Sequence, residues 1–152
     1  MKTIHTIGTQ GMNDEKFIGL LKQHNIDAVI DIRLHNEGRW YKFASGKHIS
    51  DLCGKHMIGY VHDTRFSPTR EMLSRWRENQ DWQEYERAYR QLMEERDMFW
   101  LFDEVIVGFL TPCLLCAEKS PDHCHRRLLA EHIIKSSGSE IGHIEQESFK
   151  NK

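Results

Sequence analysis

The segment Cys113–Arg126, with the sequence CLLCAEKSPDHCHR, holds the densest group of chemically active side chains in the chain. It contains three cysteines and two histidines, residue types that act as nucleophiles, general bases or metal ligands. Glu118 adds a carboxylate suited to acid–base catalysis, and Arg126 adds a guanidinium suited to an anionic ligand. We therefore expect the functional site in this segment, with Glu118 as a catalytic acid or base.

Cys124 stands where a helix is expected to begin, because apolar residues follow it at helical spacing, namely Leu128, Leu129 and Ile133. The free N–H groups and the dipole at the start of a helix favour anions and thiolates. We predict a lowered pKa and a nucleophilic role for Cys124. We also predict that His125 and Arg126 bind the substrate, since an arginine in the first helical turn is best explained by an anion nearby.

Zinc is the alternative reading of the same segment, because thiols and an imidazole are its usual ligands. Cys113 and Cys116 fall in an apolar run that is typical of a strand, where their side chains point to opposite faces. They are then unable to hold one ion together, and both are expected to be small core residues. We therefore expect no metal and no other cofactor. The zinc alternative is restricted to Cys116, Cys124 and His125.

Two further motifs follow predicted strands, as the main segment does. Gly8-Thr9 follows the strand expected over residues 2–7, and Asp31-Ile32-Arg33 closes the strand expected over residues 28–32. Ligands of open α/β sheets bind at the carboxyl ends of the strands, so these motifs should meet in one crevice. We predict Asp31 as a second catalytic carboxylate, and Thr9 and Arg33 as substrate contacts. The structural alternative is an ion-pair network of these carboxylates with Arg33 and Arg126.

Residues 33–47 lack any periodicity and are expected to form a long loop after the second strand. Long loops in compact domains are usually functional. This one carries Trp40 and Tyr41, whose rings suit stacking on nucleic-acid bases, although they equally suit closing the loop onto the core. We predict Tyr41 as a substrate contact.

The remaining patterns define the elements that must position these residues. Short apolar runs predict further strands at 58–62, 113–117 and 141–144, and helical spacing predicts helices at 13–25, 49–56, 82–96, from Pro68, from Cys124 and, less regularly, over Phe102–Leu110. The aromatic residues of 82–96 are expected to be core packing. Strand and helix alternate, which predicts a single α/β domain over residues 1–152, a Rossmann-like three-layer fold whose small, mostly parallel sheet is flanked by helices. Residues 145–152 are expected to be a frayed tail.

Composition limits the classes of partner. The hydrophobic fraction of 39% and the charged fraction of 29% suit a folded globular protein. The formal net charge of −2 argues against a protein that coats nucleic acid, so a nucleic-acid partner is not supported by charge. No apolar run reaches the length of a membrane span and no secretory signal is recognised, so we expect a cytoplasmic protein with no membrane partner. Nothing in the sequence specifies an oligomeric state.

Several motifs, taken in order, resemble the bacterial and archaeal family called domain of unknown function 488. They are Thr6-Ile7-Gly8, Asp31-Ile32-Arg33, Leu115–Pro121 with Cys124-His125-Arg126, and His143-Ile144. The resemblance covers almost the whole chain, and its most specific part is the C-A-E-x(5)-C-H-R block. It implies a single α/β domain with a Rossmann-like sheet and a polar pocket, and it implies no reaction. The positions it carries over are Asp31, Arg33, Glu118, Cys124, His125 and Arg126.

These observations lead to three hypotheses. The first is an enzyme, a hydrolase or transferase with a cysteine or carboxylate catalytic group, that acts on a small anionic or nucleotide-like molecule. The second is a nucleic-acid-associated module that binds a phosphate or a base. The third is a metal-stabilised interaction domain.

Overall fold

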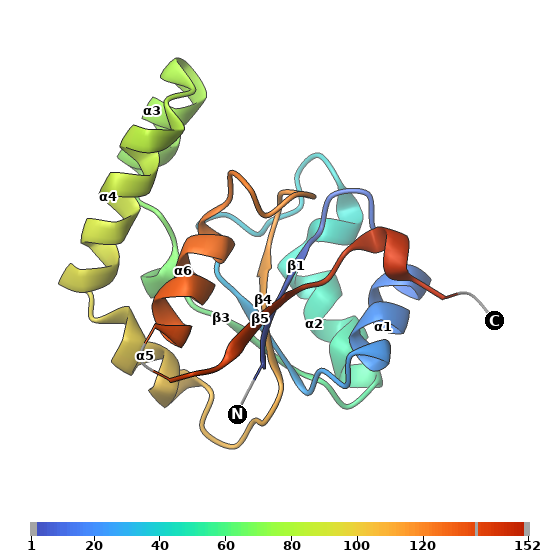
Figure 1. Ribbon diagram of the computed structural model, residues 1–152. Helices are drawn as coiled ribbons and strands as arrows, with labels where there is room; N and C mark the ends of the chain where they lie inside the picture. Colours follow the sequence, from blue (N-terminus) through green and yellow to red (C-terminus); the bar gives the residue numbers. More distant parts are fainter. Residues whose placement is uncertain (1–2, 136, 151–152) are drawn as a thin grey trace.

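The computed structural model describes residues 3–135 and 137–150, which form a parallel sheet covered by helices on both faces (Figure 1). The sheet has five strands in the order β3-β2-β4-β1-β5, and every neighbouring pair is parallel. The strands are β1 (Thr3–Gly8), β2 (Ala28–Asp31), β3 (Gly59–His62), β4 (Pro112–Cys116) and β5 (Glu140–His143). The predicted three-layer α/β fold is confirmed, with a sheet that is parallel throughout.

The helices divide between the two faces of the sheet. α1 (Asp14–Gln23) and α2 (Gly46–Lys55) cover one face, and α4 (Trp82–Glu95), α5 (Met98–Val105) and α6 (His125–Ile134) belong to the other. α3 (Arg70–Asn79) packs along α4, and the two form a hairpin that projects from the rest of the domain (Figure 1). Single 3-10 turns occupy Lys42–Ala44, Thr64–Phe66 and Gln146–Ser148. None of the described helices is both long and apolar enough to span a bilayer.

The central strand β4 supplies side chains to two separate cores. Cys113 and Leu115 belong to the core under α1 and α2, whereas Leu114 and Cys116 belong to the core under α4, α5 and α6. Because helices cover both faces of the sheet, the whole strand is apolar rather than alternating. The prediction that Cys113 and Cys116 point to opposite faces is confirmed.

Local sequence signals predict most element ends, with one clear exception. The Asn13 carboxamide oxygen accepts the N–H of Lys16 at 2.8 Å and caps α1, as expected. The helix predicted over Phe102–Leu110 is wrong in its bounds, because α5 ends at Val105. The chain then turns through Gly108, at φ +91°, and the Asp27 carboxylate accepts the N–H groups of Leu110 and Thr111.

The end of the chain is described as far as residue 150. Ile144 is buried beside the core under α1 and α2, and the 3-10 turn Gln146–Ser148 follows it. The ring of Phe149 lies so close to Gly19 of α1 that a Cβ there would meet it at 2.3 Å. Over residues 145–150 the predicted frayed tail is therefore packed against α1, and residues 151–152 of that prediction lie outside the described chain.

Candidate active site

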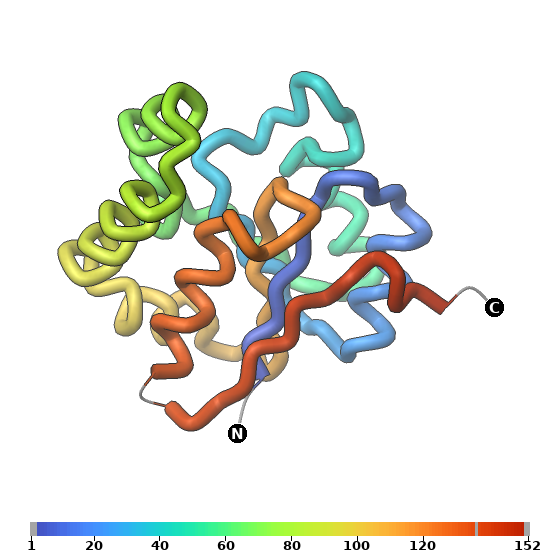
Figure 2. Tube along the Cα trace, turned by 45° about the horizontal axis from the view of Figure 1, so that its top comes forward, coloured from blue at the N-terminus to red at the C-terminus, as the bar shows by residue number. Residues whose placement is uncertain are grey.

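The three predicted motifs meet at the carboxyl ends of β1, β2 and β4. The N–H of Thr9 donates to the carbonyl of Cys116 at 2.9 Å, and the N–H of Ile32 donates to the carbonyl of Leu115 at 3.1 Å. Figure 2 shows the segments that follow β2 (cyan) and β4 (orange) at the same end of the sheet as the α3–α4 hairpin (green). The convergence expected from a parallel sheet is confirmed.

Asp31 and Arg33 form a closed, buried ion pair. Arg33 donates from Nε and Nη2 to the two carboxylate oxygens of Asp31, at 2.9 and 2.7 Å, and from Nη1 to the carbonyl of Ala44 at 2.8 Å. The Tyr60 hydroxyl donates to the same carboxylate, and burial together with this carboxylate raises the pKa of Tyr60. Asp31 is fully buried, so the pair fixes the loop after β2 to the sheet, as the structural alternative proposed.

Arg126 is buried with 1% of its surface exposed, and it ties the β4–α6 loop to β1. Its Nη1 and Nη2 donate to the carbonyls of Glu118 and Lys119, at 2.6 and 3.2 Å, and its Nε donates to the Thr6 hydroxyl at 3.2 Å. Nη1 also lies 3.4 Å from the Cys124 sulfur. In the described structure, Arg126 donates to two carbonyls, a hydroxyl and a sulfur, and to no carboxylate. The expected pairing of Arg126 with the carboxylate of Asp31 or Glu118 is therefore wrong.

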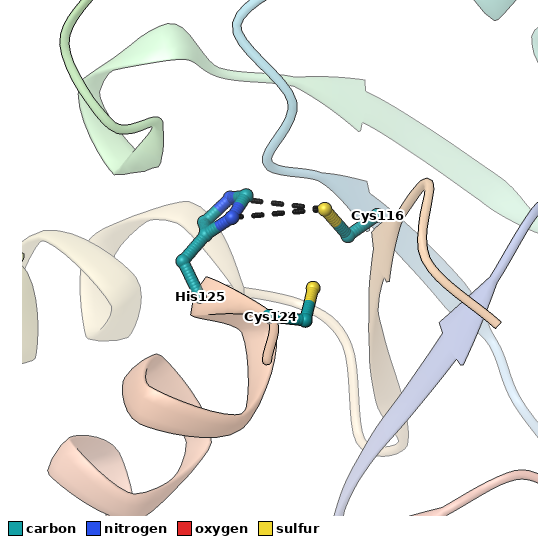
Figure 3. A group of neighbouring side chains, drawn as sticks. All are labelled: Cys116, Cys124 and His125. Carbon is teal, nitrogen blue, oxygen red and sulfur yellow. Dashed lines mark hydrogen bonds between the residues drawn. The ribbon is translucent and has the colours of Figure 1, made fainter. Parts of the chain in front are cut away.

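Cys116, Cys124 and His125 form a compact buried cluster between the end of β4 and the start of α6 (Figure 3). One donor atom from each, two sulfurs and a ring nitrogen, lie within 4.8 Å of one another. The His125 Nε2 is 2.9 Å from the carbonyl of Ile32 and must donate to it, because a carbonyl only accepts. In the neutral ring this leaves a free lone pair on Nδ1, which lies 3.7 Å from the Cys116 sulfur.

The two thiols of the cluster differ in acidity. A hydrogen bond from Cys124 lowers the pKa of Cys116, and the nearby Arg126 charge acts in the same direction. Burial, and its donation to Cys116, raise the pKa of Cys124 well above the ordinary value. The predicted lowering of the Cys124 pKa is therefore wrong, because the sulfur at the helix start is buried and acts as the donor of the pair.

A cavity of about 170 Å³ opens above this cluster. Its lining includes the aromatic residues Trp76 of α3 and Tyr85 of α4, and the histidines His35 and His123. The Trp82 ring stacks behind Tyr85 at a centroid distance of 4.9 Å and lies 5.0 Å from the His123 ring. The remaining lining residues are Arg33, Leu34, Pro68, Leu73, Cys116, Ala117, Glu118, Cys124 and His125. A mostly apolar cavity with a few convergent polar groups is the usual form of a small-molecule site.

Four of the eight predicted site residues line this cavity, namely Arg33, Glu118, Cys124 and His125. Thr9, Asp31 and Arg126 are buried and do not line it. Tyr41 lies in a neighbouring hollow that shares His35 with the cavity. The structure thus locates the predicted residues, whereas their catalytic and binding roles stay predictions.

No site role is predicted from the sequence for Trp76 or Tyr85, and Cys116 is named only in the zinc alternative. Trp76 lies in a stretch that was recognised only as helical, and its signal would have been the aromatic spacing it shares with Trp82 and Tyr85. Cys116 was expected to be a core residue, and it is packed in the core while its sulfur also faces the cluster. Its signal was its place as the last residue of a buried strand, where ligands bind.

A comparison with models of known protein families identifies the family of the chain. The family model described as Domain of unknown function DUF488 matches residues 13–133. The chain belongs to the DUF488 family. The matched range includes every residue that lines the cavity, and the resemblance inferred from the sequence motifs is confirmed. No curated protein and no solved structure matches the chain.

Proposed function

We propose that this DUF488 protein is an enzyme, a hydrolase or transferase, that acts on a nucleotide-like small molecule. The observation that carries the proposal is the cavity itself, in which aromatic walls stand over a floor of two thiols and an imidazole. The walls suit a planar ring, and the floor suits a reaction at an atom of that ring or next to it.

The ring-binding part of the proposal rests on Trp76, Tyr85 and the apolar side chains between them. Stacking on an aromatic side chain stabilises a bound base by about 1–3 kcal/mol. The tilted packing of Trp76 and Tyr85, with ring centroids 6.0 Å apart, presents two aromatic surfaces to one ligand. His35 and His123 are placed to hydrogen bond with the polar edge of the ring.

The phosphate part of the proposal rests on the neighbouring hollow, which is lined by Arg39 and Arg77 and also by His35 with its partner Glu37. Both arginines are exposed, and among the residues that the structure describes neither takes part in an ion pair. A guanidinium with free donors binds phosphate in a bidentate fashion. We therefore assign the anion to Arg39 and Arg77 in preference to Arg33, whose charge is neutralised by Asp31.

Glu118 is the candidate acid or base in this proposal. It is exposed, it lines the cavity, and it stands two residues after Cys116 at the point where β4 ends. A carboxylate at the rim can exchange protons with solvent and with a ligand below it. Its distance from any reacting atom depends on the bound ligand.

The test is a fluorescence titration with a purine nucleoside and its monophosphate, using Trp76 of the cavity wall as the reporter. Both ligands should quench fluorescence, and the monophosphate should bind at least about tenfold more tightly, since each contact with a charged group contributes about 1.5–3 kcal/mol. Arg77→Ala should weaken monophosphate binding by about tenfold or more and leave nucleoside binding unchanged, because the Arg39 contact remains. Arg87→Ala, an exposed arginine of α4 outside the cavity, is the matched control.

Two outcomes would contradict the proposal. If neither the nucleoside nor the monophosphate quenches the fluorescence, the proposal of a nucleotide-like substrate is contradicted. Tighter binding of a short single-stranded oligonucleotide than of the monophosphate, with an affinity that falls as salt rises, would instead support the nucleic-acid module. Trp40, which is 93% exposed beside Arg39, would be the stacking residue in that case.

A further inference from the structure

We infer that Cys116, Cys124 and His125 form a zinc site with three protein ligands and an open fourth position that faces the cavity. The inference deepens the proposed function, on which its catalytic meaning rests, because it names the group that would activate the bound molecule. The earlier objection to a metal concerned Cys113, which lies in the opposite core and is not part of this cluster.

The spacing of the donor atoms suits zinc. Bond lengths of about 2.3 Å to sulfur and about 2.0 Å to nitrogen place tetrahedral ligands roughly 3.5 to 3.8 Å apart. The Cys116 sulfur and His125 Nδ1 are 3.7 Å apart, and all three donor atoms lie within 4.8 Å of one another. Closing the cluster around an ion therefore needs only small side-chain movements.

The surroundings of the cluster provide two contacts that metal ligands commonly use. A ligating imidazole usually donates its other N–H to a carbonyl, and His125 does so to Ile32 at 2.9 Å. Arg126 Nη1 lies 3.4 Å from the Cys124 sulfur, so its charge would favour the thiolate that forms when a metal displaces the Cys124 proton. Two thiolates neutralise Zn²⁺, which leaves the Arg126 charge to favour an anionic or polarised atom in the fourth position.

The site combines a rigid framework with access for a ligand. Cys116 ends a strand that is paired on both sides, and Cys124 and His125 begin a helix, so the three donors are fixed by secondary structure. The three residues also line the cavity. Three protein ligands with one open position are typical of catalytic zinc, whereas structural zinc has four. The Glu118 carboxylate, a substrate atom or a water molecule would complete the coordination.

The experiment measures zinc in the reduced protein and then replaces it with Co²⁺. We expect one zinc per chain and, after exchange, an intense thiolate-to-cobalt charge-transfer band. Cys116→Ser and Cys124→Ser should each weaken metal binding by at least about tenfold, the usual effect of changing even a residue that only supports a ligand. Cys53→Ala is the matched control, because Cys53 is a buried thiol of the opposite core and should keep the band.

A second measurement uses only the wild-type protein and therefore does not depend on whether the cysteine variants fold. In the wild-type protein, a chelator should remove the metal and abolish the band, and added Co²⁺ should restore it. The inference is overturned if the reduced protein binds no Co²⁺ with a thiolate band, or if the band survives in both cysteine variants. It is also overturned if Cys116 and Cys124 are isolated as a disulfide that stays resistant to reductant.

The metal and the nucleotide are tested separately. Quenching by the nucleoside in chelator-treated protein reports on the aromatic walls, and the cobalt band in the absence of nucleoside reports on the cluster. Absence of the band alone would contradict the zinc site but not the proposed substrate. Absence of quenching alone would contradict the proposed substrate but not the zinc site.

Discussion

The four cysteines of this chain form two groups on opposite faces of the sheet, and the two groups differ in almost every chemical respect. Cys53 and Cys113 lie in the core under α1 and α2, where burial alone raises the pKa of Cys53 to about 12. Cys116 and Cys124 contact each other, an imidazole and a guanidinium, and they line a cavity. The comparison teaches that buried thiols of one protein can have different contacts and different acidity, because the surroundings set the pKa of each thiol.

The largest effect on stability is expected from Arg126→Met, which removes the cation beside Cys116 and Cys124. The change leaves the carbonyls of Glu118 and Lys119 without their donor. We expect the free energy of unfolding to fall by about 3 kcal/mol, as measured by urea denaturation. Arg127→Met, one residue along the same helix, should cost less than about 1 kcal/mol because its ion pairs lie at the surface. Equal losses in the two variants would mean that the buried bonds contribute no more than a surface pair.

A smaller effect, in rate, should distinguish the two groups of thiols directly. Iodoacetamide added to reduced, metal-free protein should label Cys116 at least about tenfold faster than Cys53 and Cys113, because Cys116 lines a cavity and has a lowered pKa, whereas the other two need local unfolding to react. Cys124 also lines the cavity but should react more slowly than Cys116, because its pKa is raised. Peptide mass spectrometry measures the four rates. Similar rates at all four positions would show that the cavity does not admit the reagent.

The smallest effect is a pH dependence of stability that comes from histidines. Like the cysteines, the histidines differ in whether their surroundings provide a partner. His125 has a hydrogen-bond partner at the cluster, whereas the buried Nδ1 of His5 has none among the described residues. Burial lowers the pKa of His5 below 6.5, so the unfolded chain binds the proton more readily. The free energy of unfolding should therefore be highest above pH 6.5 and should fall as the pH drops through 6.5 toward the lowered value of the folded state.

Denaturation at about pH 7.5 and about pH 5.5 measures this loss, and His5→Gln should make it smaller. The variant should keep part of the dependence, because burial also lowers the pKa of His132 and of His143. An unchanged pH dependence in His5→Gln would assign the whole effect to other groups.

Much of the fold could be predicted because its signals are local. The apolar run Ala28–Ile32 and the capping residue Asn13 each determine an element through their own neighbours in the chain. The bounds of α5 could not be predicted, because the turn that follows it is held by the carboxylate of Asp27, more than 80 residues away in sequence.

The site was predictable in place and less so in detail, for a similar reason. The carboxyl ends of parallel strands meet in space, so the convergence of the three motifs followed from the strand pattern. Two of the partners of Arg126 are backbone carbonyls, which every sequence contains and which no motif identifies. Trp76 reaches the cavity only through the hairpin of α3 with α4, and the packing of that hairpin is a tertiary property.

Because β4 is paired on both of its edges, it is a regular strand, and the spacing of its cysteines determines the face to which each one points. Cys113 and Cys116 are three positions apart in β4. Because successive side chains of a strand point to opposite faces, an odd separation places the two thiols in the two different cores. The same C-x-x-C spacing in a turn would bring both thiols to one ion. In this chain, whether a cysteine occupies an odd or an even position along β4 decides which face of the sheet its sulfur lies on, and only the face of Cys116 carries the cavity.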